Sequence, residues 1–174
     1  FVSYTSSRLL SLIPAYLERL LKDIDTNFRI INDLGLNLKT VYIGGGTPTI
    51  LDEHMLERLL SNITSKIDVS KLEEFTLESG RPDTITPEKL AIAKAYGVSR
   101  ICVNPQTLND AILESIGRGH TVADFYRAYD IARNSGIRCI NTDLIAGLPG
   151  EGYRSFSRSV DEVLALRPEN FTVH

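Results

Sequence analysis

The feature that most constrains the fold of this 174-residue chain is a regular alternation of helical and extended segments. The phrases AKAYGVSRICV (93–103) and ARNSGIRCIN (132–141) share one order, in which a helix end is followed by a glycine and then by a strand. No hairpin signal such as Asn-Gly joins two strand segments. Alternation of this kind indicates parallel strands connected by helical crossovers. Because no linker or low-complexity tract interrupts it, we expect a single α/β domain over residues 1–174.

Apolar residues at three- and four-residue steps predict the helices, and short apolar runs predict the strands. The expected helices cover 7–34, 52–65, 86–97, 109–116, 121–136 and 155–166, and the expected strands cover 39–43, 74–77, 100–103, 138–145 and 171–173. Asp52, Thr86 and Thr121 are the expected N-caps, and Pro14 marks a kink or a late start of the first helix. Since such a sheet usually begins with a strand, we expect the first strand to be missing and its place to be open. An open edge favours an edge-to-edge dimer.

Composition excludes several classes of function. A net charge of −3 provides no basic surface for nucleic acid. The apolar stretches are too short to cross a bilayer, and no signal peptide is visible. Cys102 and Cys139 lie in apolar, strand-like contexts and are expected to be buried free thiols, which favours a reducing, cytoplasmic location. The three histidines show no metal-ligand spacing, and we expect His54 in the solvated first turn of a helix.

The run Gly44-Gly45-Gly46-Thr47-Pro48-Thr49 directly follows the apolar segment 41–43. Glycine has no Cβ, so a ligand can approach the main chain closely, and Pro48 turns the chain away from the strand. The carboxyl ends of parallel strands are where α/β proteins bind ligands. The run is neither a P-loop nor a G-x-G-x-x-G motif. It therefore predicts a small-molecule site, with a tight strand-to-helix turn as the plainer alternative.

Polar residues also follow, or lie late in, the other strand segments. Glu78 ends one strand and Gln106 follows another. Arg118 lies between two expected helices, and Asp143 sits within an apolar strand, where a carboxylate is costly unless it is paired. If the strands are parallel neighbours, these groups gather at one end of the sheet around the glycines. Such a set suits a zwitterionic or hydroxyl-rich ligand. His120 adjoins Arg118 and could line the same site, although a loop histidine is more often polar surface.

The glycine run, Glu78, Gln106, Arg118 and the phrase DLIAGLPGE (143–151) together resemble the radical S-adenosylmethionine family. The phrases NPQTLND (104–110) and IGRGHT (116–121) resemble its oxygen-independent coproporphyrinogen III oxidase (dehydrogenase) branch. The resemblance covers nearly the whole chain. It implies an incomplete parallel (β/α)6, TIM-like barrel without its first strand. It also implies an enzyme of heme biosynthesis that converts the propionates of a porphyrinogen into vinyl groups.

The family uses S-adenosylmethionine and a [4Fe-4S] cluster held by a CxxxCxxC loop, and it generates a 5′-deoxyadenosyl radical. By the resemblance, Gly45 contacts the methionyl part through its backbone, and Gly46 and Thr47 line the site. Glu78 binds the cofactor. Gln106, Arg118 and Asp143 would hold a second S-adenosylmethionine or the substrate side, with Arg118 a partner for Asp143.

The sequence contains no CxxxCxxC motif. The chain as given is therefore expected to hold neither cofactor and to be inactive, as part of a radical enzyme. Two alternatives remain open. One is a heme chaperone of the same superfamily. The other is an ordinary TIM-barrel hydrolase or aldolase, which would need a catalytic lysine or a metal at a strand end; the lysines that lie before strands or on helices disfavour it, namely Lys39, Lys66, Lys71, Lys89 and Lys94.

Overall fold

The structure, a computed structural model, describes residues 7–174; the first six residues of the predicted domain lie outside the described residues. Five parallel strands form one sheet in the order β1-β2-β3-β4-β5. The strands are β1 (Thr40–Ile43), β2 (Glu74–Ser79), β3 (Arg100–Val103), β4 (Cys139–Leu144) and β5 (Asn170–Val173). The α-helices are α1 (Ser7–Leu10), α2 (Ile13–Asp33), α3 (Glu53–Thr64), α4 (Pro87–Ala95), α5 (Asp110–Ser115), α6 (Val122–Asn134) and α7 (Tyr153–Ala165).

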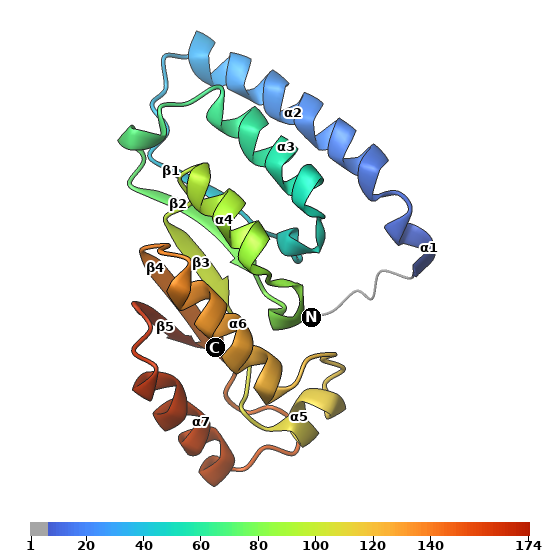
Figure 1. Ribbon diagram of the computed structural model, residues 1–174, viewed down its shortest axis with the longest axis vertical. Helices are drawn as coiled ribbons and strands as arrows, with labels where there is room; N and C mark the ends of the chain where they lie inside the picture. The colour runs from blue at the N-terminus through green and yellow to red at the C-terminus, as the bar shows by residue number, and fades with distance from the viewer. Residues whose placement is uncertain (1–6) are drawn as a thin grey trace.

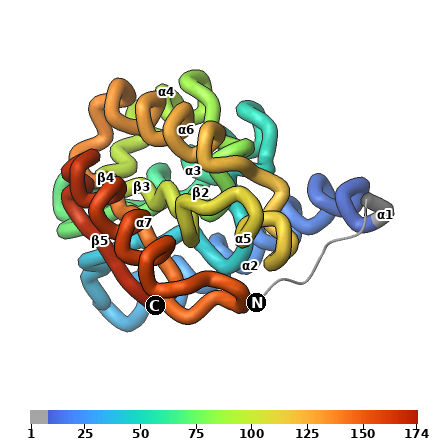
Figure 2. Tube along the Cα trace, turned by 90° about the horizontal axis from the view of Figure 1, so that it is seen from below, coloured from blue at the N-terminus to red at the C-terminus, as the bar shows by residue number. Residues whose placement is uncertain are grey.

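The order of the strands in the sheet is also their order in the sequence, so each crossover joins adjacent strands (Figure 1). Right-handed crossovers between successive neighbours place their helices on one face of the sheet. Figure 2 shows α4 and α6 side by side, on the same side of β3 and β4. The α/β class and the parallel barrel-like arrangement predicted from the sequence are confirmed.

Alternate strand residues form the core beneath these helices. Phe75 and Leu77 of β2, Ile101 of β3 and Ile140 of β4 are each at most 1% exposed. They pack with apolar residues of the covering helices, such as the fully buried Phe125 of α6. The intervening strand residues, which face away from the helices, are mostly polar. The sheet therefore has one apolar face that stabilises the fold and one polar face that is available for binding.

Three predicted caps hold the helices as expected. Asp52 accepts a hydrogen bond from Met55 N, Thr86 from Lys89 N, and Thr121 forms a capping box with Asp124. The helix predicted over 7–34 is interrupted at residues 11–12 and restarts as α2 with Pro14 near its amino end, which agrees with the kink or late start predicted at Pro14. The helix predicted from Ser155 begins earlier, at Tyr153, after the N-cap Gly152, which has no side chain to signal it.

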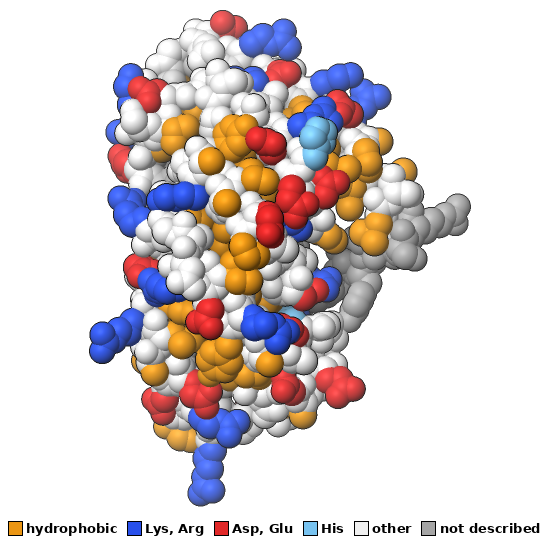
Figure 3. Space-filling view, in the orientation of Figure 1, with side chains coloured by type: hydrophobic (Ala, Val, Ile, Leu, Met, Phe, Trp, Pro, Cys, Tyr) orange, Lys and Arg blue, Asp and Glu red, His pale blue; other side chains and the backbone are white. Residues whose placement is uncertain are grey.

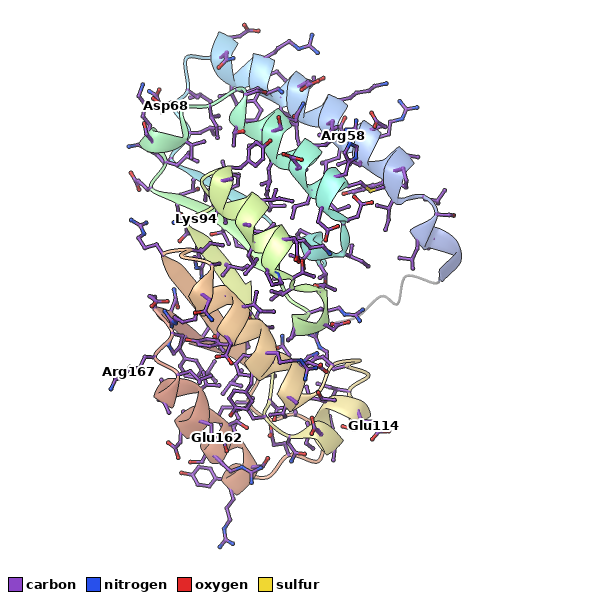
Figure 4. All side chains as sticks on the ribbon, in the orientation of Figure 1. Arg58, Asp68, Lys94, Glu114, Glu162 and Arg167 are labelled. Atoms are coloured by element: carbon purple, nitrogen blue, oxygen red, sulfur yellow. The ribbon has the colours of Figure 1, made fainter. Side chains whose placement is uncertain are left out.

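The outer edge of β1 pairs with no strand among residues 7–174, so the place predicted to be open is open. The edge-to-edge dimer stays a prediction. Charged side chains of both signs intermingle on the helix-covered face (Figure 3). Several of them, including Arg167 and Glu114, project away from the body of the molecule (Figure 4). In the described part of the chain, no helix has the length and apolar character needed to cross a bilayer.

Candidate functional site

The glycine run after β1 is tied to the end of β2 through Glu78. The Oε2 atom of Glu78 accepts hydrogen bonds from Gly45 N at 3.2 Å and from the Tyr42 hydroxyl at 3.3 Å. A Cβ on Gly44 would lie 2.2 Å from Cε1 of Tyr42 and 2.5 Å from Glu78 Oε2, so only glycine fits beneath these two side chains. Gly45 and Gly46 have φ angles of +86° and +141°, which favour glycine. Among residues 7–174, no heavy atom apart from those of the adjacent residues lies within 4 Å of a Cβ built on either one.

Tyr42 is a stable donor to this carboxylate. Partial burial, followed by the nearby Cys102 and Glu78, raises the pKa of Tyr42 to about 12. The phenol therefore keeps its proton at neutral pH. Glu78 is half-buried, and its Oε1 atom accepts no hydrogen bond from the described residues. The arrangement thus presents a fixed carboxylate oxygen beside exposed backbone amides, which suits an ammonium or hydroxyl donor.

Gln106 lies between the carboxyl ends of β3 and β4. Its φ of +70° is rare for a residue other than glycine. Its N–H donates to the Asp143 carbonyl at 3.2 Å, and its carbonyl accepts from Ile145 N at 2.9 Å. The turn therefore makes two backbone hydrogen bonds with the carboxyl end of β4. The structure therefore brings Gln106 and Asp143 together, as the sequence predicted.

The side chain of His120 is hydrogen-bonded to the same turn. It is 3% exposed, and its Nε2 donates to the Pro105 carbonyl at 3.3 Å. Burial lowers the pKa of His120, so the ring is neutral at physiological pH. The expectation that a loop histidine lies on the surface is wrong here, because the ring fills the space behind the 105–106 turn.

Arg118 and Thr47 complete the predicted set. Arg118, half-buried, donates from Nη1 to the Gly80 carbonyl at 3.5 Å, directly after β2. Thr47 is half-buried in the loop that follows Gly46, and its carbonyl accepts from Ile50 N at 2.9 Å. All seven predicted residues thus lie at or beyond the carboxyl-terminal halves of the strands, or contact a segment that does; they are Gly45, Gly46, Thr47, Glu78, Gln106, Arg118 and Asp143.

Asp143 is held by side chains that the sequence analysis did not identify. Asn104 Nδ2 donates to its Oδ2 at 3.0 Å, and Asn141 Nδ2 donates to its Oδ1 at 2.7 Å. His174 Nε2 lies 3.4 Å from Oδ2. The expectation had been a pairing with Arg118; the observed partners are amides and an imidazole on the same polar sheet face. The polar–apolar alternation within CINTDL (139–144) is the signal that could have revealed this face.

The two cysteines are free, but only Cys102 is buried; Cys139 is half-buried, which corrects the expectation of two buried thiols. Cys139 is the first residue of β4. It lies beside Arg100 on the polar face of the sheet, which the helices do not cover. Burial raises the pKa of Cys102 to about 11, although Arg100 opposes the shift.

This shift predicts a pH-dependent stability. The unfolded thiol loses its proton near its ordinary pKa of 9.0, whereas the folded thiol keeps it until about 11. The free energy of unfolding should therefore fall as the pH rises through this window, by up to about 2 kcal/mol between pH 8 and pH 10.5. Urea titrations of the parent protein and of Cys102→Ala at both pH values check this, because the variant should lose less stability. An equal loss in both proteins would contradict it.

Among residues 7–174, no three His, Cys, Asp or Glu side chains are placed to hold one metal ion. His54 lies exposed in the first turn of α3, as predicted. The polar groups that the described site offers are carboxylates, side-chain amides, a guanidinium and backbone amides.

Comparison with known proteins gives a consistent result. Residues 5–163 match the Radical SAM superfamily. The chain is 44% identical over 140 residues to the oxygen-independent coproporphyrinogen-III oxidase-like protein HemZ of Bacillus subtilis, covering 80% of this chain and 28% of HemZ. It is 40% identical over 139 residues to the heme chaperone HemW of the same organism, covering 79% of this chain and 36% of HemW.

Among solved structures, coproporphyrinogen III oxidase (HemN) from Escherichia coli aligns with a TM-score of 0.82 and 24% identity, over 97% of this chain and 38% of that one. At this identity the likeness establishes the fold. The chain spans about a third of the length of the two curated relatives described above. The match to the superfamily covers most of the sequence and agrees with the parallel sheet and its glycine-bordered edge. The chain belongs to the Radical SAM superfamily.

Proposed function

We propose that this chain forms the S-adenosylmethionine-binding part of an enzyme that decarboxylates the propionates of coproporphyrinogen III without oxygen. The observation that carries the proposal is the pair of hydrogen bonds to Glu78, whose Oε2 is held by Gly45 N and the Tyr42 hydroxyl while Oε1 accepts no hydrogen bond from the described residues. Membership of the superfamily supports S-adenosylmethionine and a [4Fe-4S] cluster as its cofactors. The 44% identity to HemZ supports the porphyrinogen substrate.

The residues present fit S-adenosylmethionine. Its methionyl end carries an ammonium and a carboxylate, and its ribose carries two hydroxyls. Glu78 can accept a hydrogen bond from the ammonium, and the open backbone at Gly45 and Gly46 allows the methionyl part to approach closely. Asp143 can accept hydrogen bonds from ribose hydroxyls or from a second ammonium. Gln106 and Thr47 add neutral hydrogen-bonding groups at the same edge of the sheet.

When bound to a reduced cluster, S-adenosylmethionine supplies a 5′-deoxyadenosyl radical, which can remove a hydrogen atom from carbon. A propionate side chain would become a vinyl group by losing one hydrogen atom to that radical, carbon dioxide, and one electron to an external one-electron acceptor. In this chain, Arg118 provides a guanidinium suited to a propionate carboxylate. The half-buried carboxylates of Glu78 and Asp143 keep the cofactor oriented, so that its reactive carbon meets the substrate in one geometry.

A heme chaperone is the second candidate, because the chain is 40% identical to HemW of Bacillus subtilis. The two functions differ in their products. The anaerobic full-length protein with a reconstituted cluster should convert coproporphyrinogen III into a vinyl-bearing product and release carbon dioxide and 5′-deoxyadenosine. Stoichiometric heme binding and transfer, with no carbon dioxide released, would favour the chaperone instead.

Glu78→Gln tests the cofactor site directly. The variant keeps the shape of the side chain but removes the charge that an ammonium would pair with. We expect S-adenosylmethionine affinity to fall roughly ten- to a hundredfold, since one charge-assisted hydrogen bond contributes about 1.5–3 kcal/mol. Isothermal titration of the full-length protein measures this. The exposed Glu73→Gln, on the loop before β2, is the control and should bind like the parent protein. Unchanged affinity in Glu78→Gln would reject this role for Glu78.

A further inference from the structure

The polar face of the sheet carries a connected set of hydrogen bonds that ends on Asp143. Arg100 of β3 donates from Nη2 to Asn141 Oδ1 at 2.9 Å, and Asn141 in turn donates from Nδ2 to Asp143 Oδ1 at 2.7 Å. On the other side, Asn104 donates from Nδ2 to Asp143 Oδ2 at 3.0 Å. Each carboxylate oxygen of Asp143 thus receives one amide donor from a different element.

The two asparagines are themselves fixed. Asn104 is 5% exposed and Asn141 is 3% exposed. The Asn104 Oδ1 accepts from Asp143 N at 3.1 Å, so Asn104 grips both the backbone and the side chain of the same residue. Arg100 is anchored on its other side by Glu74, at 3.4 Å. Neither asparagine can therefore turn away from Asp143 without leaving a buried amide unpaired, which is costly.

The direction of these bonds is informative. Every hydrogen bond from Arg100 through Asn141 points its donor toward Asp143, which is the direction that stabilises a negative charge at the end of the chain. The two amides leave each carboxylate oxygen with further acceptor capacity, and the exposed His174 also lies 3.4 Å from Oδ2 through its Nε2 atom. The side chain of Asp143 is 18% exposed, so the carboxylate is not fully enclosed by the protein.

We propose that Asn104 and Asn141 are positioning residues for Asp143, which hold its carboxylate in the orientation that accepts hydrogen bonds from S-adenosylmethionine. The proposal rests on the proposed function, because it takes the ligand from there. Arg100 acts one step further away, by orienting Asn141 and polarising its amide. Fixing the carboxylate before the ligand arrives lowers the entropy lost on binding.

The test is a double-mutant cycle on S-adenosylmethionine affinity in the full-length protein. Asp143→Asn, Asn104→Ala and Asn141→Ala should each weaken binding roughly tenfold or more. In the Asp143→Asn background, Asn104→Ala and Asn141→Ala should each change affinity by less than about twofold, because the group that they position no longer carries the charge. Thermal melts confirm that affinity is measured on folded protein.

Two further sets of variants keep the test decisive. Asn104→Leu and Asn141→Leu keep the approximate volume of the buried side chain but remove the donor, so they should bind as weakly as the alanine variants. Asn62→Ala is the matched control, because Asn62 makes the same kind of bond, to Asp25 Oδ1 at 3.0 Å, on the far helices α3 and α2. It should lower stability only.

The outcomes separate the two proposals. A parent protein that does not bind S-adenosylmethionine would overturn the proposed function and this inference with it. A parent protein that binds, with losses from the asparagine variants that add fully to that of Asp143→Asn, would overturn the positioning role alone. Full affinity in Asn141→Leu would do the same. Coupled losses together with an unaffected Asn62→Ala would support it.

Discussion

Replacing Gly44 with alanine is expected to abolish most S-adenosylmethionine binding, with a loss on the order of a hundredfold. The new methyl group would overlap the Tyr42 ring and the Glu78 carboxylate, both of which can move only by leaving the hydrogen bonds that hold them. The φ angle of Gly44 is not in the left-handed region, so alanine strains the site and not the backbone. Isothermal titration of the full-length protein measures the loss of affinity.

Gly152→Ala is the control for this substitution. A Cβ on Gly152 meets no heavy atom within 4 Å, and its φ is −86°. It is the N-cap of α7, so alanine costs at most about 1 kcal/mol of stability and should leave affinity unchanged. Equal affinity in the two alanine variants would show that the space that a Cβ on Gly44 would occupy is not part of the binding site.

Phe75→Ala is expected to cause the largest loss of stability. Phe75 is 1% exposed on the apolar face of β2, and truncation of such a ring costs about 3–5 kcal/mol. For a domain of this size, the melting temperature should fall by roughly 6–20 °C. Tyr153→Ala, at a side chain that is 83% exposed, should change it by no more than a degree or two. Differential scanning calorimetry measures both melting temperatures. A decrease below about 3 °C for Phe75→Ala would mean that the surrounding core closes into the space left by the missing ring.

The order and type of the elements could be predicted because the signals are local. The caps Asp52, Thr86 and Thr121 each act within three residues, and the glycines that end helices need only their own backbone freedom. The prediction was wrong where no side chain marks a boundary. Gly152 caps α7 without a polar side chain, so the predicted start of that helix was too late.

The composition of the site was predictable in part for a different reason. In a parallel sheet, residues just after each strand converge, so Gly45, Glu78, Gln106 and Asp143 could be placed at one edge without knowing any contact. Their partners could not be predicted. The bond from Asn104 to Asp143 depends on the register between β3 and β4, in which Cys102 lies opposite Asn141. Register across a crossover of more than 30 residues is decided by packing, which a linear pattern does not contain.

The sequential strand order has a consequence for how the chain acquires its structure during synthesis. Within residues 7–174, each strand pairs only with the strands that precede and follow it in the sequence. A ribosome delivers the chain from its amino end, and domains generally fold in that direction. The sheet can therefore grow by adding one strand and its covering helix at a time, without waiting for a distant segment. At each stage, the next strand pairs with the strand that was completed before it. The newly formed edge of the growing sheet therefore stays unpaired only while one helical crossover emerges from the ribosome.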